Sequence, residues 1–573
     1  MGVGATDTGG RVLASLGATG PVAAEFVSCA DVPRAGVLLA LPALLACGLL
    51  THTDKHFQLA RGYYGLVHVF VLVAVLALAR IKTLESLRYC APGEWGKVLG
   101  LDRIPEVRTL RRKLDQLGQE QPVAEWSAEL CRDWMVADPP SAGTLYVDGH
   151  VRVYHGSAAH LPKHYVSRQR LCLRATTDYW INAADGQPFF VLHTPVDPGL
   201  LAVLENQIVP RLEQEVPGQP GVAELAADPF LDKFILVFDR EGYSPDFLAR
   251  MKQRRIGCLT YHKHPGPDWP LQEFQTQRVK LAHGNEEELL LAEQRTKLSN
   301  GMEVRQIRHL DATGHQTAIL VSAEGLRTGA AAAAMFGRWS QENFLKYARQ
   351  HYALDHLLQH RVEALPETTQ VVNPRWRELD SQRRSLASQR HRKLAEFGGL
   401  NLTQPIAPAA VEVFVRDKSA LQQAIGRLEQ QWVQVKEQLK QTPHHIPQSE
   451  VEKTQRFDRL SVGAKDLVDT IKLIAYRAET AMSHLVREHL PAGRRGEERR
   501  LLVSLYGSEA DLMPDATAGT LAVRLHYPAN PQLGRVVQAL CEELTATETL
   551  FPTTQLRLVY EMVGEQPPAT PDG

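Results

Sequence analysis

Thr144-Leu145-Tyr146-Val147-Asp148 opens the run of strands that decides the fold of this chain. The strand texture continues through residues 151–154, and a second strand over residues 171–181 precedes a third over residues 188–192. An Asp185-Gly186 pair separates the last two, and that dipeptide is typical of tight hairpin turns. The segment therefore predicts three antiparallel strands, the first of which carries Asp148.

The chain then alternates helices with strands. A helix is expected over residues 198–215, and Lys233-Phe234-Ile235-Leu236-Val237-Phe238 reads as a buried strand that ends at Asp239. Ser244-Pro245 supplies an N-cap and a first helical residue for a helix to about residue 255. A strand over residues 256–261 follows. Three strands, helix, strand, helix, strand is the element order of the ribonuclease H-like fold.

Residues 262–325 interrupt this order with further strands, for example 304–310 and 317–321, and predict a β-rich insertion. A helix over residues 329–350 then resumes the core and carries Glu342. The expected fold class is α+β or mixed, with a ribonuclease H-like core. The core is divided into residues 140–261 and 326–370.

The flanks complete the predicted domain organisation. Residues 1–36 are predicted to be a disordered lead-in, and residues 37–139 a helical, DNA-binding domain with a turn at 92–96. Residues 371–490 are predicted to form a basic and amphipathic helical region. Residues 491–573 are predicted to form a small α+β tail with strands at 500–506, 520–526 and 555–560. Basic helices suit contact with DNA phosphates. The residues expected to make it are Arg111, Arg112, Lys113, Arg383 and Arg384. The alternative is that these helices present solvated charged faces.

Composition narrows the class of protein. The chain has 573 residues and a formal net charge of -1, so any affinity for nucleic acid must come from local patches. Seven scattered cysteines without a CxxC pair are typical of reduced thiols in an intracellular protein. Apolar stretches at residues 37–50 and 66–79 are shorter than the ~18 to 20 residues that span a bilayer. They predict buried helices, with membrane association as the alternative.

Three acids carry the candidate chemistry. Asp148, Asp239 and Glu342 are 91 and 103 residues apart, and in the expected fold they lie on neighbouring elements. Carboxylates are the ligands that divalent hard cations prefer, so the set predicts a site for two Mg²⁺ or Mn²⁺ ions. Glu241 is a rival third ligand. Arg338, Glu342 and Lys346 follow each other at intervals of four, which an ordinary salt-bridge ladder would also explain.

Tyr146-Val147-Asp148-Gly149-His150, Val237 to Ser244, and Arg338-Trp339-Ser340-Gln341-Glu342-Asn343-Phe344-Leu345-Lys346-Tyr347 resemble motifs of the DDE transposases of bacterial insertion sequences, in the branch with a β-rich insertion. The resemblance covers about residues 140 to 350. It implies that the three acids hold the metal ions, that Arg338 and Lys346 grip phosphates, and that Trp269 or Trp339 stacks on a flipped base. Trp339 stands where the family motif would have tyrosine, which leaves the style of cleavage open.

The resemblance also implies the partners: double-stranded DNA at the element ends and at the target, bound by a homodimer or higher oligomer in the cytoplasm, associated with the nucleoid. No GxxxxGK[ST] or GxGxxG occurs in a suitable context, so no nucleotide cofactor is expected, and a GxSxG elbow is lacking. A structural zinc site remains an alternative, built from the histidines His150, His155, His160 and His164. The rival functions are a nuclease, a DNA-binding protein without catalysis, and a membrane protein.

Overall fold

A computed structural model describes residues 4–166, 169–281, 286–336, 338–354, 362–400 and 406–564 of the chain. The fold is a mixture of helices and strands, as the sequence predicts. Two compact units are present. Unit 1 comprises residues 1–152, 177–360 and 461–573, and unit 2 comprises residues 153–176 and 361–460.

The centre of unit 1 is a mixed sheet in which β4, β2, β6 and β7 follow one another and β5 pairs with β4. Its strands are β2 (Thr144–Val153), β4 (Leu171–Asn182), β5 (Pro188–Thr194), β6 (Ile235–Phe238) and β7 (Gly257–Tyr261). Strand β6 runs parallel to both β2 and β7, and β5 is antiparallel to β4 across a turn in which Gly186 has a φ of 90°. These are the strands that the sequence predicts.

The middle strands are apolar because both faces of the sheet are covered. Val147, Leu236, Val237, Cys258 and Leu259 are all fully buried. Such continuous apolar runs are typical of parallel strands that lie inside a fold. Helix α12 (Pro245–Gln253) begins as predicted, since the hydroxyl of Ser244 accepts a hydrogen bond from the Phe247 amide at 3.3 Å. The segment before β6 forms α9 (Leu200–Val203), a π turn (Leu204–Ile208), α10 (Val209–Glu215) and α11 (Val222–Ala227).

The region after β7 extends the same sheet. Its four antiparallel strands follow in the order β11-β10-β9-β8, and β11 pairs directly with β7. They are β8 (Gln275–Lys280), β9 (Glu286–Lys297), β10 (Glu303–Leu310) and β11 (Gln316–Val321). Helix α13 (Thr328–Phe336) packs on these strands and closes a second apolar core. The single helix expected over residues 329–350 is instead two helices, α13 and α14 (Trp339–Tyr352).

The helical part of unit 1 is built around α17 (Gly463–His489), which packs on helices from the first quarter of the chain. These are α2 (Leu41–Ala46), α4 (Leu66–Leu78), α6 (Val107–Leu117) and α7 (Glu120–Ala137). The short helices α3 (Thr53–His56) and α5 (Pro92–Val98) lie between them in the chain, and α8 (Pro139–Ala142) follows α7. The turn expected at residues 92–96 is therefore wrong, because Pro92 starts α5 as its first helical residue. Residues 371–490 do not form one region, since α17 belongs to unit 1.

Helix α4 explains the second apolar stretch. All but two of its 13 residues are buried, and a helix that is apolar all round belongs in a protein core or a membrane. Here the helix is covered by α17 and α6. In the described ranges, none of the helices combines the length and apolar character that crossing a membrane requires.

The two ends of the chain share one sheet. Strand β1 (Cys29–Val32) pairs with β16 (Ala510–Asp515), followed by β17 (Thr520–His526) and β18 (Arg557–Val563), with α19 (Pro531–Ala546) packed on β18. Helix α1 (Thr8–Ser15) and β1 contradict the expected disordered lead-in. The strand expected at residues 500–506 is α18 (Glu498–Gly507), which buries residues 502, 505 and 506 at helical spacing.

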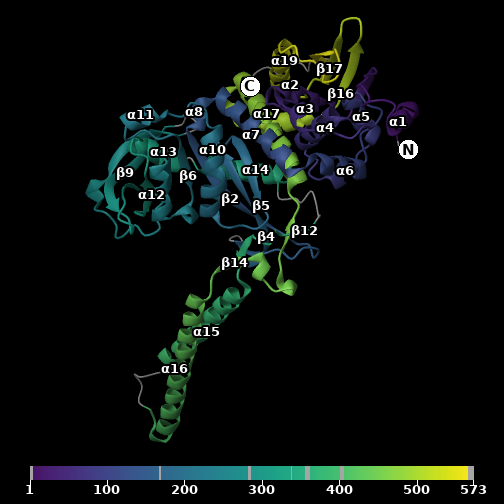
Figure 1. Cartoon of the computed structure of the whole chain (residues 1–573). Coiled ribbons are helices and arrows are strands. Elements are labelled where there is room, and N and C mark those ends of the chain that lie inside the picture. The colour runs from purple at the N-terminus through teal and green to yellow at the C-terminus, as the bar shows by residue number, and fades with distance from the viewer. Residues whose placement is uncertain are drawn as a thin grey trace. The chain divides into compact units, whose positions relative to one another are not determined.

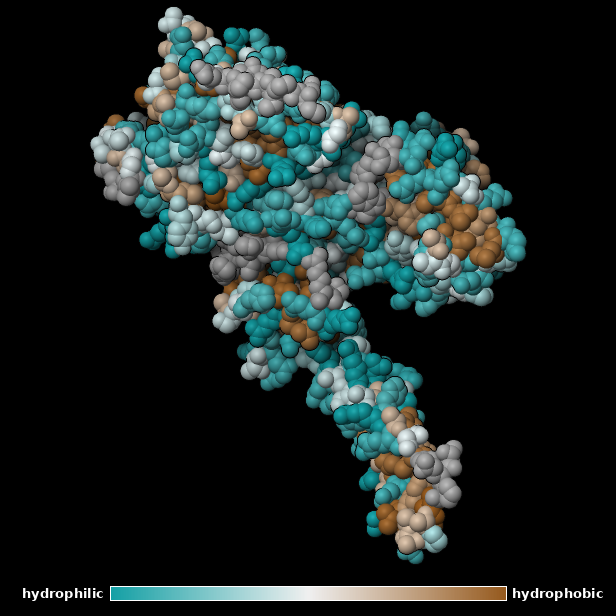
Figure 2. Space-filling model, turned by 180° about the vertical axis from the view of Figure 1, so that it is seen from behind, coloured by the Kyte–Doolittle hydropathy of each residue, from teal (hydrophilic) through white to brown (hydrophobic). Residues whose placement is uncertain are grey.

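Unit 2 is a helical hairpin on a small base. Helices α15 (Pro374–Gly398) and α16 (Val411–Gln441) lie side by side along their length (Figure 1). The base pairs β12 (Val362–Ala364) with β15 (Asp458–Leu460), β13 (Gln370–Val372) with β14 (His445–Pro447), and β3 (Lys163–Val166) with the start of β4. Apolar side chains reach the surface along the arm (Figure 2).

Candidate active site

Asp148 and Asp239 are brought together by two parallel strands. The pairing of β2 with β6 sets Val147 opposite Phe238, so the two aspartates are the next residues along each strand. The side chain of Asp148 accepts a hydrogen bond from the Gly149 amide at 3.0 Å, and that of Asp239 accepts one from the Arg240 amide at 2.7 Å. Both acids therefore stand where the parallel pairing of β2 and β6 ends in the carboxyl direction, the side on which open α/β sheets bind ligands.

Glu342 arrives from the first turn of α14, which a buried glutamine fixes to the sheet. The amide nitrogen of Gln341 donates to the backbone oxygen of Trp180 at 2.9 Å, to that of Tyr146 at 3.3 Å and to the Asn182 side chain at 2.9 Å. Gln341 is 1% exposed, so these bonds replace those that water would make. The next residue, Glu342, projects an exposed carboxylate.

The C-terminal part of α14 is held to α17 by a buried glutamate. Glu479 of α17 is fully buried, and Arg80 donates to both of its oxygens at 2.8 and 2.9 Å. The hydroxyls of Tyr347 and Tyr352 also donate to this carboxylate. Burial raises the pKa of Glu479, but the charges of Arg80 and Arg499 outweigh it and hold the pKa below its usual range. A fixed helix therefore carries Glu342.

Arg338 lies among the three acids. Its guanidinium is 2.7 Å from Glu342 Oε1 and 3.9 Å from Asp148 Oδ2, and it also interacts electrostatically with Asp239. The first rung of the expected salt-bridge ladder is present in the Arg338–Glu342 pair. Lys346 is exposed and makes no ion pair with the described residues, so the ladder does not continue.

The electrostatics of Asp148 show that the acids share one environment. Burial raises the pKa of Asp148 most strongly, the charge of Arg338 lowers it, and the charges of Asp239 and Glu342 raise it again, to about 6. Glu241, the rival ligand, is also affected by Asp239, since burial and the charges of Asp239 and Asp197 raise its pKa. Accumulated negative charge of this kind is what a bound divalent cation relieves.

The donor set fits a hard divalent cation, because every side chain offered is a carboxylate. The constellation is open: among described residues, the only three acids, histidines or cysteines with ligand atoms all within 4.8 Å of one another are Asp31, Asp511 and His526. That group is an ion pair of the terminal sheet, with His526 Nε2 at 3.2 Å from Asp31. The expected alternative of a zinc site of histidines is not found in the described part of the chain.

The residues expected to contact DNA have different surroundings. Arg111 forms an ion pair with Glu85, whereas its neighbours Arg112 and Lys113 line a pocket. Arg383 and Arg384 both pair with Asp380 on α15.

The two expected tryptophans also differ. Trp269 lies under the guanidinium of Arg308, 4.3 Å from the ring centre. Trp339 belongs to α14, and its side chain falls outside the described residues.

A comparison with protein-family models gives a match that covers almost the whole chain. A family model described as a transposase protein matches residues 2–564. The chain belongs to this family. A comparison with curated proteins found no match. Membership of a transposase family indicates a DNA-processing enzyme.

A buried charge network in the transposase was not foreseen from its sequence. Asp178 of β4 lies 2.6 Å from His193 of β5 and 3.2 Å from Arg152 of β2, and His193 reaches Asp469 of α17 at 3.3 Å. Burial lowers the pKa of His193, but Asp178 and Asp466 outweigh it and raise the pKa to about 9. The protonated imidazole therefore links the sheet to α17. Gln341 and Glu479 were missed as well, because their partners are distant in sequence.

Proposed function

We propose that the transposase is a DDE enzyme with a ribonuclease H-like core, which cleaves DNA at the ends of an insertion sequence and joins the freed 3′-hydroxyl to target DNA. One observation carries the proposal. Two aspartates follow directly after the last paired residues of parallel strands β2 and β6, and Glu342 of α14 and Arg338 just before that helix share their electrostatic environment.

Asp148, Asp239 and Glu342 would hold two Mg²⁺ or Mn²⁺ ions. When bound, such a pair supplies an activated oxygen nucleophile and stabilises the leaving oxygen of an in-line phosphoryl displacement. Asp148 must be ionised to act as a ligand. Its pKa of about 6 allows this at neutral pH, and its proton competes with the metal in mild acid.

Arg338 and Lys346 are the phosphate-binding side chains of the proposal. The Arg338 guanidinium has several donors in one plane, so it can contact a phosphate oxygen while it remains beside Glu342. Lys346 lies two helical turns further along the chain, on α14, and offers an exposed ammonium. Together they would align the scissile phosphate with the carboxylates.

The remaining contacts to duplex DNA are assigned to basic side chains outside the core. Arg111, Arg383 and Arg384 would bind backbone phosphates of the duplex, whereas Arg112 and Lys113 would bind a phosphate that reaches the pocket they line. Trp269 or Trp339 would stack on a flipped base. Arg111, Arg383 and Arg384 would have to share their present acidic partners with DNA. More than one copy of the chain would bring the element ends together.

The test uses the purified transposase with labelled duplexes that carry the element ends, a target plasmid and Mg²⁺. The wild-type protein should nick the ends and join them to the plasmid, and D239N should do neither. Strand cleavage by D239N would overturn the proposal, and cleavage without any joined product would favour a nuclease.

A matched pair of variants distinguishes the two possible third ligands. E342Q and E241Q each remove one exposed charge beside the aspartates. The proposal expects E342Q to abolish cleavage and to weaken Mn²⁺ binding in calorimetry, while E241Q keeps both. The opposite pattern would assign the third ligand to Glu241.

A further inference from the structure

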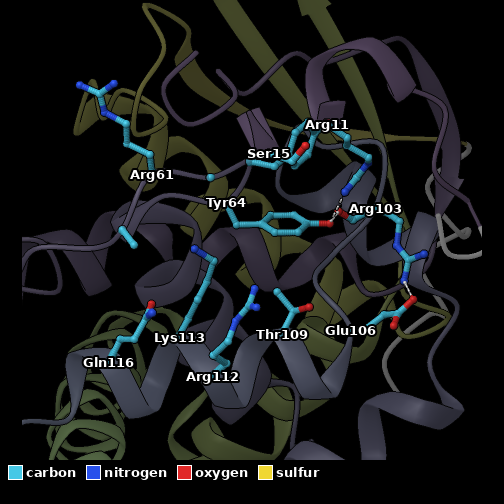
Figure 3. A pocket seen from close by; sticks show the side chains of 13 residues that line it. Arg11, Ser15, Arg61, Tyr64, Arg103, Glu106, Thr109, Arg112, Lys113 and Gln116 are labelled. Atoms are coloured by element: carbon cyan, nitrogen blue, oxygen red, sulfur yellow. Dashed lines mark hydrogen bonds and ion pairs between the residues drawn. The ribbon is translucent and has the colours of Figure 1, made fainter. Parts of the chain in front are cut away.

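A basic pocket lies in the helical part of unit 1, between α1, the loop at residues 60–64 and α6 (Figure 3). Its volume is ≈ 820 Å³. Five cations and one acid line it: Arg11, Arg61, Arg103, Arg112, Lys113 and Glu106. The excess of four positive charges is notable in a chain whose net charge is -1.

Two of the cations build the wall of the pocket. Arg11 pairs with Asp102 and donates to the hydroxyl of Tyr64 at 3.1 Å, which fixes α1 over the rim. Arg103 lies 3.2 Å from Glu106, so the one acid of the pocket already has a cationic partner. These pairs leave no carboxylate in the lining to neutralise the remaining cations.

Lys113 is the unusual member of the lining. The residue is 6% exposed, yet its ammonium has no hydrogen bond or ion pair with any described residue. Its side chain rises from α6 into the pocket beside that of Arg112 (Figure 3). Burial and then the charge of Arg112 lower the pKa of Lys113 to about 8, so the ammonium is still charged at neutral pH.

No described residue packed around Lys113 supplies the missing negative charge. His68 of α4 feels the charge of Lys113, and burial first and then that charge lower its pKa to about 4, so it is neutral. Tyr64 is un-ionised at neutral pH, since burial raises its pKa. A buried cation without a counter-ion is unfavourable, and an anion in the pocket would provide one.

A phosphate monoester matches this lining best. It carries close to two negative charges at neutral pH and three terminal oxygens. Arginine forks and a lysine ammonium are the usual partners of such a group, and the hydroxyls of Ser15 and Thr109 add donors. An intact duplex cannot enter a recessed site of this volume, whereas a strand end or a single nucleotide can.

We propose that this pocket binds a phosphate monoester, which comes either from the 5′-phosphorylated end of a DNA strand or from a free small phosphate ester. The DNA source rests on the proposed function, because strand cleavage that leaves a 3′-hydroxyl also leaves a 5′-phosphate. The free ester does not depend on it.

The experiment measures binding to the full chain in EDTA, so that no cleavage occurs. Three probes are compared: inorganic phosphate, a nucleoside 5′-monophosphate, and one short single-stranded oligonucleotide with either a 5′-phosphate or a 5′-hydroxyl. We expect the phosphate esters to bind and K113M to weaken them roughly ten- to hundredfold, the loss typical of a charge-assisted contact. R108Q, which removes an exposed charge outside the pocket on the same helix, should bind like the wild type.

The probes distinguish the two possible sources of the phosphate. Preference for the 5′-phosphorylated strand over its 5′-hydroxyl counterpart identifies a DNA end, and binding of the monophosphate with equal binding of the two strands identifies a free ester. Equal phosphate affinity of K113M and wild type overturns the proposal. K113M should fold, because methionine keeps the volume and removes a buried charge, and thermal unfolding checks this.

The proposed function and the pocket fail independently. D239N leaves the pocket unchanged and should bind the phosphorylated probe like the wild type. Normal cleavage with no phosphate binding would overturn only the pocket, and phosphate binding without cleavage would overturn only the active site.

Discussion

Replacing Asp148 by asparagine should make the metal-free transposase more stable while it removes a proposed ligand. The carboxylate is half-buried next to Asp239 and near Glu342, and it is ionised at neutral pH against the cost of burial and repulsion. Asparagine has nearly the same shape without the charge. The variant therefore resembles the protonated form of Asp148 at every pH.

The pKa of Asp148 gives the size of the effect. The difference between the ordinary value of 3.8 and about 6, at ~1.4 kcal/mol per pKa unit, corresponds to about 3 kcal/mol in the free energy of unfolding. One quarter of the side chain is exposed, so solvent screening reduces the expected gain to about 2 kcal/mol.

The gain must depend on pH in a defined direction. Between pH 3.8 and about 6 the folded protein holds a proton on Asp148 that the unfolded chain has released, so wild-type stability from this group falls as pH rises. Below that window both states are protonated and D148N has no advantage. Above it the full difference is present.

The assay is denaturant unfolding in EDTA at about pH 4.5 and about pH 8, with D54N as control because Asp54 is exposed on α3. D148N should exceed the wild type by about 2 kcal/mol at the higher pH and by much less at the lower one, while D54N stays within ~0.5 kcal/mol of the wild type. A loss of stability at about pH 8, or an equal gain at both values, would refute the reasoning.

Three further predictions concern the helix that carries Glu342. E479Q should lower the free energy of unfolding by about 3 kcal/mol, because it leaves the half-buried cations Arg80 and Arg499 without their buried counter-charge. E488Q, on an exposed face of the same helix, should leave denaturant midpoints unchanged. R338M removes the cation that lowers the pKa of Asp148. Mn²⁺ binding, measured by calorimetry, should therefore begin at a higher pH in R338M than in the wild type. An unchanged pH of onset would contradict this. Q341L should cost about 2 kcal/mol in unfolding and reduce cleavage, since three buried acceptors lose their donor, whereas exposed N343A should affect neither measurement.

The sequence predicts what local patterns determine. The runs of residues that lead to Asp148 and Asp239 are continuously apolar, and Ser244-Pro245 is a local start signal for a helix. These strands and this helix could therefore be located without a structure. The adjacency of the two aspartates follows from parallel pairing. The apolar residues of the 500–506 segment fit both the two-residue period of a strand and the 3.6-residue period of a helix. Packing against other elements makes this segment a helix.

Long-range packing could not be read from the sequence. Nothing in residues 463–489 indicates that they pack on α4, some 400 residues earlier in the chain, and β1 has no local signal that its partner is β16. The placement of Arg338 among the acids, the anchoring role of Gln341 and the buried partners of Glu479 depend on contacts of the same kind. Of the basic pocket, the sequence indicates only the neighbouring cations Arg112 and Lys113 of α6.

The pairing of β1 with β16 has a consequence for synthesis of the protein. A ribosome releases Cys29–Val32 long before Ala510–Asp515 exists, and the apolar face of α4 emerges before α17 can cover it. The helical part of unit 1 can close only when almost the entire chain has been translated. Premature termination before α17 would leave a fragment with exposed apolar helices, a target for chaperones and proteases, so an aborted message would yield no stable DNA-binding remnant.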